Sequence, residues 1–571
     1  MERIRRFKPY RLSGCGRPNI RVACIMDAFS YACFKYECKL MHLNVSTWRR
    51  QIQYFKPNLL LVESAWQGLD RSWRRQLYDI GGKRDVVIRE IIRFCRKNGI
   101  PTVFWNKEDS PNYKHFISTA KLFDYVFTTD ANCIKRYRRD LGHDRIDVLP
   151  FAAQPVLHNP VDTSYHSKEN VAFAGTWYRT KYPHRPKDMS LILGPARSLN
   201  LHIFDRKRNY RINNVYKFPK IYRPYIVGSL PYEEMVEAYK LYKVFLNVNS
   251  VKDSPTMFSR RVFEILAAGT NVISTYSLGI ETMFSGIVPI AGSVDETNAL
   301  LHSLLHNAHY SERLSLLGLR EVHLKHLYRH RFDQILKTLG IAASPHKGVA
   351  IIACQDQYAY LDGLLNSFHN QALEHKELIL LFDETAISEK QVKELQSKPN
   401  VVLHLFSEET PFDERIGLAI RHTGYDFVAL MNGTDYYAAH FLTDLMHAFH
   451  YTDATIVGKL TRYLYLETRK QLMLVSPDKE NQYVERLSGE AMIIKKQVLS
   501  EISLRGRTNE EFERFFSDCR SNGMKMFAAD KFNYIRIVKK SDESSLSGDE
   551  VDIKTTTAVS CSGDHLAYAT V

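Results

Sequence analysis

Short apolar runs alternate with helix-spaced segments along most of the chain. The run Leu59–Val62 is continuously apolar and lies between Pro57 and Glu63, which is typical of a strand buried on both faces. Residues 84–98 have helical spacing and stop at Gly99. Further strands are expected at 20–26, 101–105, 125–129 and 147–150, with a helix at 45–55. The alternation predicts a Rossmann-like domain with a parallel sheet over residues 1–155.

The same pattern restarts twice. Strands at 170–176, 201–205 and 244–248 with a helix at 231–241 predict a second doubly wound domain over residues 156–343. Strands at 349–354, 376–383 and 425–431 with a helix at 360–369 predict a third α/β domain over 344–540. Residues 541–571 are rich in Ser, Thr, Asp and Gly, and we expect a disordered tail.

The net charge and the distribution of cysteines restrict the classes of binding partner and the cellular compartment that we expect. The net charge of +15 favours anionic partners such as nucleoside diphosphates, phosphorylated polymers, nucleic acid or acidic lipid. The nine cysteines are scattered without a CxxC pair, and no secretory segment or apolar run of ~20 residues occurs, so we expect a cytoplasmic protein. The basic start Met1–Lys8 has two interpretations, a solvated leader, which we favour, and a contact with an anionic membrane surface.

The segment 259–274 carries the most informative polar residues. Arg260 and Arg261 begin a short helix, Glu264 projects from its apolar remainder, and Gly269 ends it before a buried strand. Arginine forks pair with pyrophosphate, and a carboxylate accepts hydrogen bonds from ribose hydroxyls. Taken alone, a surface helix explains the segment equally well. No Walker loop, GxGxxG after a strand, HExxH or GxSxG is present, which argues against a dehydrogenase.

Other polar residues cluster where predicted strands end. In the first domain they are acids, namely Asp27, Glu63, Glu108 and Asp109. In the second domain they are Gly175, Thr176, Lys181, Arg185, Arg260, Arg261 and Glu264. An acidic lobe facing a phosphate-binding lobe suits sugar transfer from a nucleotide, because a carboxylate deprotonates the acceptor and basic groups neutralise the diphosphate. For each acid alone, a helix cap or a loop charge is the simpler explanation, so only the joint arrangement favours catalysis.

Residues 20–340 resemble GT-B glycosyltransferases of the CgeB/YkvP spore maturation type. The matching stretches are 56–66, 101–109, 171–176, 238–247 and 260–269. The resemblance implies that Glu264 contacts the donor ribose, that Arg260 or Arg261 contacts the pyrophosphate, and that this site needs no metal. Many GT-B enzymes carry a second glutamate where this chain has Thr256, so the donor sugar and the stereochemical outcome stay open.

The third domain resembles a GT-A glycosyltransferase domain. Its run Leu430–Tyr437 lies where a metal-binding Asp-x-Asp-Asp run is expected, but Asn432 and Thr434 replace two acids and only Asp435 remains. With only one carboxylate left, this run predicts at most weak binding of Mg²⁺ or Mn²⁺, at Asp435. Glu510 and Glu511 are candidates to stand in for a catalytic acid pair. We favour a degenerate domain that serves as an acceptor or partner platform.

The sequence supports three classes of function. The first is a cytoplasmic glycosyltransferase, membrane-peripheral or spore-associated, that moves a sugar from a nucleotide-sugar donor to a cell-surface, teichoic-acid-like or spore-coat glycan or glycoprotein. The second is a non-catalytic glycan-binding or assembly protein on degenerate transferase scaffolds. Nucleic-acid binding is the third and weakest, because the charge supports it but no reader motif does.

Overall fold

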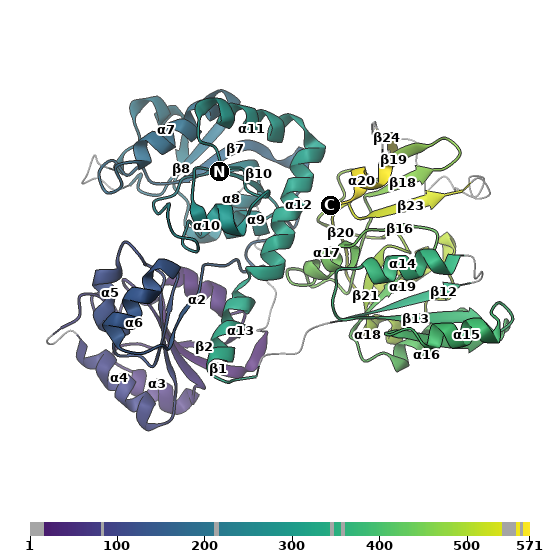
Figure 1. Cartoon of the computed structure of the whole chain (residues 1–571), viewed down its shortest axis with the longest axis horizontal. Coiled ribbons are helices and arrows are strands. Elements are labelled where there is room, and N and C mark those ends of the chain that lie inside the picture. The colour runs from purple at the N-terminus through teal and green to yellow at the C-terminus, as the bar shows by residue number, and fades with distance from the viewer. Residues whose placement is uncertain are drawn as a thin grey trace. The chain divides into compact units, whose positions relative to one another are not determined.

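The computed structural model divides the chain into two compact units. It describes residues 16–81, 85–209, 216–342, 348–355, 360–539, 556–559 and 564–571, so the basic start Met1–Lys8 lies outside the described residues. The N-terminal unit comprises residues 1–160 and 168–344, and the C-terminal unit comprises residues 161–167 and 345–571. In Figure 1 the N-terminal unit runs from purple to teal, and most of the C-terminal unit runs from green to yellow.

The first half of the N-terminal unit is a six-stranded parallel sheet in the order β2-β1-β3-β4-β5-β6. Val22 and Cys24 of β1 enter one core cluster and Ala23 and Ile25 another, so both faces of the sheet are covered. The sequence missed β2, because in this edge strand only Cys38 is buried. The elements are β1 (Arg17–Ile25), α2 (Ala28–Phe34), β2 (Cys38–His42), α3 (Trp48–Phe55), β3 (Leu59–Glu63), α4 (Val86–Lys97), β4 (Thr102–Asn106), α5 (Tyr113–Ala120), β5 (Tyr125–Thr128), α6 (Ile134–Leu141) and β6 (Ile146–Val148).

The second half is a five-stranded parallel sheet in the order β11-β10-β7-β8-β9. Its strands confirm the three predicted runs, and α9 with β11 is the helix and strand predicted from the arginine segment. The elements are β7 (Glu169–Gly175), α7 (Arg185–Ala196), β8 (Leu201–Asp205), β9 (Ile226–Gly228), α8 (Tyr232–Lys240), β10 (Tyr242–Asn247), α9 (Arg261–Ala267), β11 (Asn271–Ser274), α10 (Leu278–Met283), α11 (Val294–His306) and α12 (Ala308–Lys325).

The last helix of the N-terminal unit, α13 (Tyr328–Thr338), returns to the first half. Figure 1 shows it beside β1 and β2. The ring of Tyr328 lies 4.9 Å from that of Phe34, and Gln334 donates to Asp147 at 2.9 Å. The predicted second domain, 156–343, includes α13, although these contacts of the helix lie in the first half.

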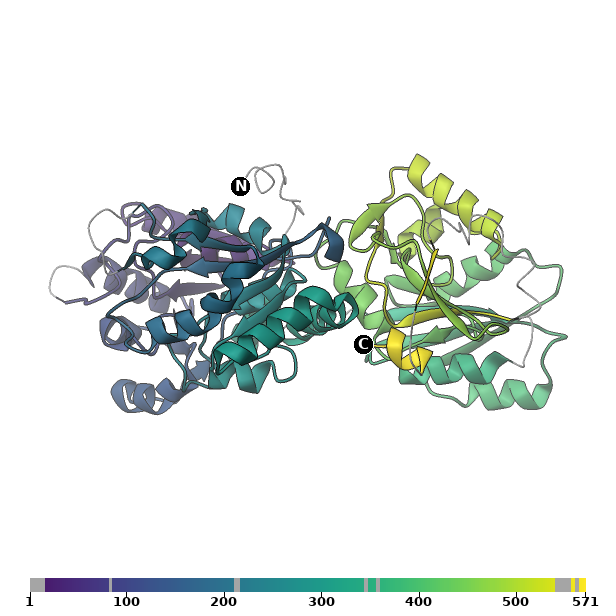
Figure 2. The same ribbon diagram turned by 90° about the horizontal axis from the view of Figure 1, so that it is seen from above.

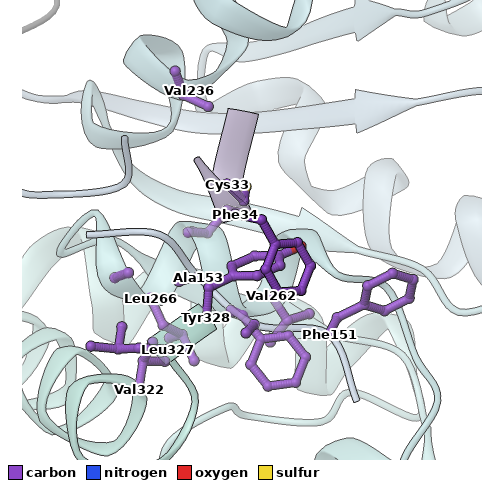
Figure 3. Packing of buried hydrophobic residues seen from close by; sticks show 14 of the residues in the cluster. Cys33, Phe34, Phe151, Ala153, Val236, Val262, Leu266, Val322, Leu327 and Tyr328 are labelled. Carbon is purple, nitrogen blue, oxygen red and sulfur yellow. The ribbon is translucent and has the colours of Figure 1, made fainter. Parts of the chain in front are cut away.

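One hydrophobic cluster joins the two halves of this unit. It contains Cys33 and Phe34 of α2, Val262 and Leu266 of α9, and Tyr328 of α13. Figure 3 shows these side chains lying close together. The two sheets thus share a core, which holds the ends of their strands in one arrangement.

The C-terminal unit holds two sheets. The larger is mixed, in the order β14-β13-β12-β15-β21-β17-β22-β20, and the smaller has the order β16-β23-β18-β19-β24. The sequence predicted β12, β13 and β15 but missed the short strands of the smaller sheet. The strands are β12 (Val349–Gln355), β13 (Lys376–Asp383), β14 (Val401–Phe406), β15 (Phe427–Leu430), β16 (Tyr436–Tyr437), β17 (Ile456–Gly458), β18 (Arg462–Leu466), β19 (Gln471–Val475), β20 (Gln482–Val484), β21 (Met492–Lys495), β22 (Met526–Ala528), β23 (Tyr534–Val538) and β24 (Thr556–Ala558). The helices are α14 (Leu361–Asn370), α15 (Glu389–Gln396), α16 (Phe412–His422), α17 (Phe441–Ala448), α18 (Lys496–Glu501), α19 (Asn509–Ser521) and α20 (His565–Ala569).

The expected disordered tail contains ordered elements. Strand β24 pairs antiparallel with β19, and the backbone of Asn533 donates to the carbonyl of Ala569 at the end of α20. Figure 2 shows α20, in yellow, against the strands of this unit. Low hydrophobicity misled the prediction here, since edge pairing satisfies backbone groups without a large apolar contribution. Residues 541–555 and 560–563 lie outside the described residues.

Among the residues that the structure describes, no helix is both long and apolar enough to cross a membrane.

Candidate functional site

A cavity of about 390 Å³ lies between the two halves of the N-terminal unit, and we call it the cationic cleft. In the second sheet the strand order reverses between β7 and β10, which is where ligands bind in open α/β sheets. Gly175 and Thr176 at the end of β7, and Val248 and Ser250 after β10, line the cleft at this point. The other lining residues are Phe29, Lys107, Glu108, Pro111, Asn112, Phe151, Tyr178, Tyr182, Arg185, Arg206, Tyr239, Val251, Met257, Phe258, Ser259, Arg260 and Arg261.

Charge in the lining is strongly one-sided. Five of the described lining residues are cationic (Lys107, Arg185, Arg206, Arg260 and Arg261), and Glu108 is the one acid among them. Burial first, and then the neighbouring Arg261, lowers the pKa of Arg185 to about 10. Burial also lowers the pKa of Arg261, where Arg206 and Arg260 add repulsion. Crowded guanidinium groups that depress one another's pKa values stabilise a bound anion.

Arg185 is held in place by the strand ends. Its Nη1 donates to the carbonyl of Val248 at 2.9 Å and to Ser250 Oγ at 3.0 Å. Arg206, directly after β8, donates to the Tyr178 hydroxyl at 2.8 Å. Both side chains are therefore oriented by groups that carry no charge, so their positive charge is left to act on a ligand.

Gly175 brings the backbone close to Arg261. A Cβ at Gly175 would lie 3.6 Å from Arg261 Nη1 and 2.8 Å from the Phe173 ring, so a larger residue would clash. Thr176 contributes a buried hydroxyl that has no hydrogen-bond partner among the described residues. A buried hydroxyl without a partner, in a lining that also contains guanidinium groups, is consistent with a site for phosphate oxygens.

Arg260, the neighbour of Arg261, has a different environment. Its guanidinium lies 3.9 Å from the ring of Phe29, which belongs to the first half, and 4.8 Å from the ring of Tyr232. It also pairs with Glu264 at 3.3 Å. Burial alone would lower the pKa of Arg260, but Glu264 raises it above its ordinary value. Arg260 thus lines the cleft but has its charge paired with Glu264 and joins the halves, whereas Arg261 lies beside Gly175 in the cleft.

Glu264 lies behind the cleft wall rather than in its lining. Its Oε1 accepts from the Tyr232 hydroxyl at 2.9 Å and lies 3.7 Å from His158 Nε2. Burial would raise the pKa of Glu264, but Arg260 and His158 lower it. Its Oε2 has no hydrogen-bond partner among the described residues. The expected ribose contact therefore stays a prediction, and what the structure shows is the centre of a buried polar network.

His158 completes this network as a neutral ring. Burial lowers its pKa to about 4, so it is uncharged near neutral pH. Its Nδ1 accepts from the backbone of Gln154 at 3.0 Å, which places the proton on Nε2, 3.0 Å from the Tyr232 oxygen. Nothing in the sequence indicated His158, because its partners are 74 and 106 positions away.

Of the four acids predicted in the first half, the structure places Glu108 in the cleft lining. Its Oε2 accepts from Asn112 Nδ2 at 2.8 Å, which orients the carboxylate. Glu108 also follows β4, the strand paired with β3 and β5, so it occupies the carboxyl edge of the sheet as predicted. This carboxylate is the candidate base of the cleft.

The other three acids are used within the first half. Lys107 pairs with Glu63 at 2.8 Å and with Asp27 at 3.3 Å. Asp27 also accepts from three consecutive backbone N–H groups, Trp66 to Gly68, and although burial opposes them, Lys107 and these donors lower its pKa. Glu63 is fully buried, and burial raises its pKa. The geometry assigns both acids to positioning Lys107, which itself lines the cleft.

Asp109 belongs to the core although it neighbours Glu108. It is fully buried and accepts from Asn106, Thr128 and Tyr137 at 2.8, 2.6 and 2.9 Å. Burial raises its pKa to about 7. The catalytic role expected for Asp109 therefore does not fit its position, since a buried carboxyl with three donors cannot reach an acceptor.

Lys181 and Thr256, both singled out in the sequence, lie outside the described cleft lining. Lys181 is exposed, with its ammonium 5.4 Å from the Tyr182 ring, and it lies outside the lining. Thr256 joins the halves, because its Oγ1 accepts from the backbone of Ala131 at 2.9 Å and donates to the Thr129 carbonyl at 2.8 Å. The residue that replaces the second glutamate of many GT-B enzymes thus has a structural function here.

Asp435 in the C-terminal unit does not fit a metal site. Its carboxylate accepts from Asn432 at 3.0 Å, Tyr534 at 2.8 Å and the backbone of Ile537 at 3.1 Å. Burial raises its pKa, although the hydrogen bonds oppose this. In the described part of the chain, no group of three or more His, Cys, Asp or Glu side chains could hold a metal ion. Glu511 caps α19 through Thr508, so of the pair only Glu510 stays available.

Comparison with known proteins supports a transferase-like domain in this region. A family model described as glycosyl transferase-like matches residues 190–337, which include Arg206, Arg260 and Arg261. Residues 190–337 therefore form a glycosyl transferase-like domain. No curated protein matches the chain.

Among solved structures, S. aureus TarS 1–349 matches with 14% identity and a TM-score of 0.26, covering 33% of this chain and 60% of that one. The complex of TarS 1–349 with UDP-GlcNAc matches with 13% identity and a TM-score of 0.29, covering 36% and 64%. The chain spans less than two thirds of these proteins, and scores this low carry no argument about activity.

Proposed function

We propose that the protein is a glycosyltransferase that binds a nucleoside-diphosphate sugar in the cationic cleft. The observation that carries this proposal is the excess of guanidinium groups at the strand-order reversal of the second sheet, opposite a single carboxylate. A diphosphate carries two or more negative charges, which Arg185, Arg206 and Arg261 neutralise together. The glycosyl transferase-like match over residues 190–337 supports the same assignment.

In the proposed reaction, Glu108 accepts the proton of the acceptor hydroxyl. The acceptor oxygen forms a bond to the anomeric carbon, and the bond from this carbon to the diphosphate oxygen breaks. The electron pair leaves with the diphosphate, where the arginines stabilise the developing charge. Lys107, held by Glu63 and Asp27, lines the same cleft as Glu108.

The finer assignment rests on the resemblance to CgeB/YkvP-type GT-B enzymes. On this resemblance we propose that the acceptor is a cell-surface, teichoic-acid-like or spore-coat glycan or glycoprotein. We also propose that the protein is cytoplasmic. It also keeps Glu264 as the proposed ribose contact, which its Oε2 can make only if the cleft wall in front of it moves when the donor binds.

Donor hydrolysis and calorimetry test the proposal directly. UDP-, GDP-, CDP- and dTDP-sugars are incubated with the full chain, and the corresponding diphosphates are titrated into it. We expect turnover of at least one donor and binding of its diphosphate, weakened about 30-fold in Arg261→Ala because a charge-assisted hydrogen bond contributes about 2 kcal/mol. The matched variant Arg486→Ala, in the C-terminal unit, leaves this binding unchanged. Absence of both turnover and diphosphate binding rejects the proposal.

The alternative, a glycan-binding protein without transferase activity, is favoured by two observations. Thr256 and Glu264, positions that contact the donor in the resembling family, are engaged in contacts within the unit. Binding of glycans without any diphosphate binding is the outcome that would establish this alternative.

A further inference from the structure

A second cavity, of about 530 Å³, lies within the C-terminal unit, and we call it the balanced cavity. Its volume falls in the range of ligand sites, roughly 300–1,000 Å³. Its described lining residues are Asn432, Thr434, Asp435, Leu460, Arg462, Val475, Ser476, Arg486, Leu487, Ser488, Gly489, Glu490, Arg507, Asn509, Glu510, Phe512, Glu513, Phe516, Tyr534, Arg536 and Ile537.

The balanced cavity lies at the strand-order reversal of the larger sheet. Strand β12 pairs with β13 on one side and with β15 on the other, so the order reverses between β12 and β15. Asn432, Thr434 and Asp435 follow the carboxyl end of β15, and Arg507 donates to the Cys354 carbonyl in β12 at 2.6 Å. Open α/β sheets bind ligands at this position.

The charges in this lining are equal in number. Four arginines (Arg462, Arg486, Arg507, Arg536) are accompanied by four acids (Asp435, Glu490, Glu510, Glu513) among the described lining residues. Arg507 pairs with Glu490 at 2.8 Å and Arg486 with Glu513 at 3.3 Å. A wall without net charge offers no general attraction to a diphosphate, and Asp435 is not available to hold a bridging cation.

Neutral polar and aromatic groups complete the lining. Hydroxyl and amide side chains of Thr434, Ser476, Ser488 and Asn509 line the cavity, and the buried rings of Phe512 and Phe516 stack behind them with centroids 6.2 Å apart. Hydroxyl, amide and paired charged groups offer both donors and acceptors, as the hydroxyl groups of a sugar require.

We propose that the balanced cavity binds neutral sugar residues of a glycan, without nucleotide and without metal. This inference goes beyond the proposed function, because it concerns a separate unit and does not require sugar transfer. It assigns a ligand to a cavity of this unit that polar residues line at a strand-order reversal.

Saturation-transfer NMR on the full chain in EDTA tests the proposal. The probes are neutral tetrasaccharides of glucose, N-acetylglucosamine, galactose and mannose. We expect transfer to at least one of them, and a loss of about tenfold or more in affinity in the double variant Glu510→Ala/Glu513→Ala. Both residues are exposed on α19 and line the cavity. The matched control is Arg514→Ala/Asp518→Ala, which changes two exposed residues of the same helix outside the lining.

The Arg261→Ala variant separates this proposal from the proposed function. Because Arg261 lies in the cationic cleft, the variant retains oligosaccharide binding if the sugar occupies the balanced cavity. Three results overturn the proposal: no transfer to any tetrasaccharide, equal transfer in the Glu510→Ala/Glu513→Ala variant, or, in a buffer without EDTA, displacement of the bound sugar by UDP with Mn²⁺ in Arg261→Ala. The last result would identify a nucleotide site instead.

Discussion

The cationic cleft and the balanced cavity occupy equivalent places in their sheets but differ in charge. Each lies where the strand order reverses, yet the cleft has five cationic residues against one acid and the cavity has four against four. Arg185 and Arg206 of the cleft are oriented by carbonyl and hydroxyl oxygens, whereas Arg486 and Arg507 of the cavity, like Arg260 of the cleft, pair with carboxylates. The position in the fold therefore indicates where a ligand binds. The contacts of the charged side chains determine which class of ligand fits there.

The largest expected effect concerns Glu108, the single acid in the described lining of the cationic cleft. It tests whether this acid differs in function from the acids of the balanced cavity. Glu108→Gln lowers kcat of the transferase about 10²–10⁴-fold, because an amide cannot accept the acceptor proton. Diphosphate affinity stays within about twofold, since the arginines are unchanged. Steady-state transfer and calorimetry measure the two effects. Glu510→Gln in the cavity is the control and leaves transfer unchanged; full activity in Glu108→Gln means that another group is the base.

The second effect separates the two neighbouring arginines of the cleft. Arg260→Ala leaves Glu264 buried without its ion pair and lowers the free energy of unfolding by about 3–5 kcal/mol. Arg261→Ala, which faces the cleft, lowers it by less than about 1 kcal/mol. Urea unfolding of both variants at pH 7 measures the difference. Equal destabilisation would contradict the distinct roles assigned to them.

The third effect concerns Asp109, the buried neighbour of Glu108. The folded state keeps its proton up to about pH 7, while the unfolded state loses it near the ordinary pKa of 3.8. Folding thus takes up a proton between these values, and the contribution of Asp109 to stability falls by about 1.4 kcal/mol per pH unit as the pH rises. Asp109→Asn removes this decline, which unfolding curves from pH 4 to 7 detect. Parallel pH profiles for variant and wild type would show that Asp109 ionises normally.

The smallest expected effect is at Asp435. Replacing EDTA with Mn²⁺ changes the unfolding temperature by less than about 1 °C, because an ion that does not bind the native state cannot stabilise it. Differential scanning calorimetry makes the measurement, with Asp435→Asn as the comparison. A clear stabilisation by Mn²⁺ that Asp435→Asn abolishes would restore the metal site that the GT-A resemblance predicts.

Sequence reasoning was most accurate for buried parallel strands. The predicted run 201–205 is β8 to the residue, because Leu201, Ile203 and Phe204 form a short, mostly apolar run that Asp205 ends at a turn. It failed for β16 and β24, whose two or three residues carry too little pattern, and for α13, whose amphipathic face does not say which sheet it covers.

Within the candidate site, the sequence predicted which types of residue line the cleft and that they lie at the ends of strands. Arg185, Arg261, Gly175 and Thr176 are in the cleft as expected, and Arg206, which was missed, had the same signal of directly following a strand. The sequence could not show that Glu108 lines the cleft whereas Asp109 is buried. Side chains of adjacent residues point in different directions, and only the folded backbone determines those directions.

By itself the sequence determined the alternation of strands and helices, the two parallel sheets and the polar residues at their carboxyl ends, because burial and periodicity act locally along the chain. Only the tertiary structure determined which charged side chains contact one another and which other groups they contact. The pairing of Lys107 with Asp27 spans 80 residues, and the stacking of Phe29 on Arg260 joins two sheets. Such contacts depend on how the sheets share a core, and electrostatic roles follow from distance and burial rather than from position in the chain.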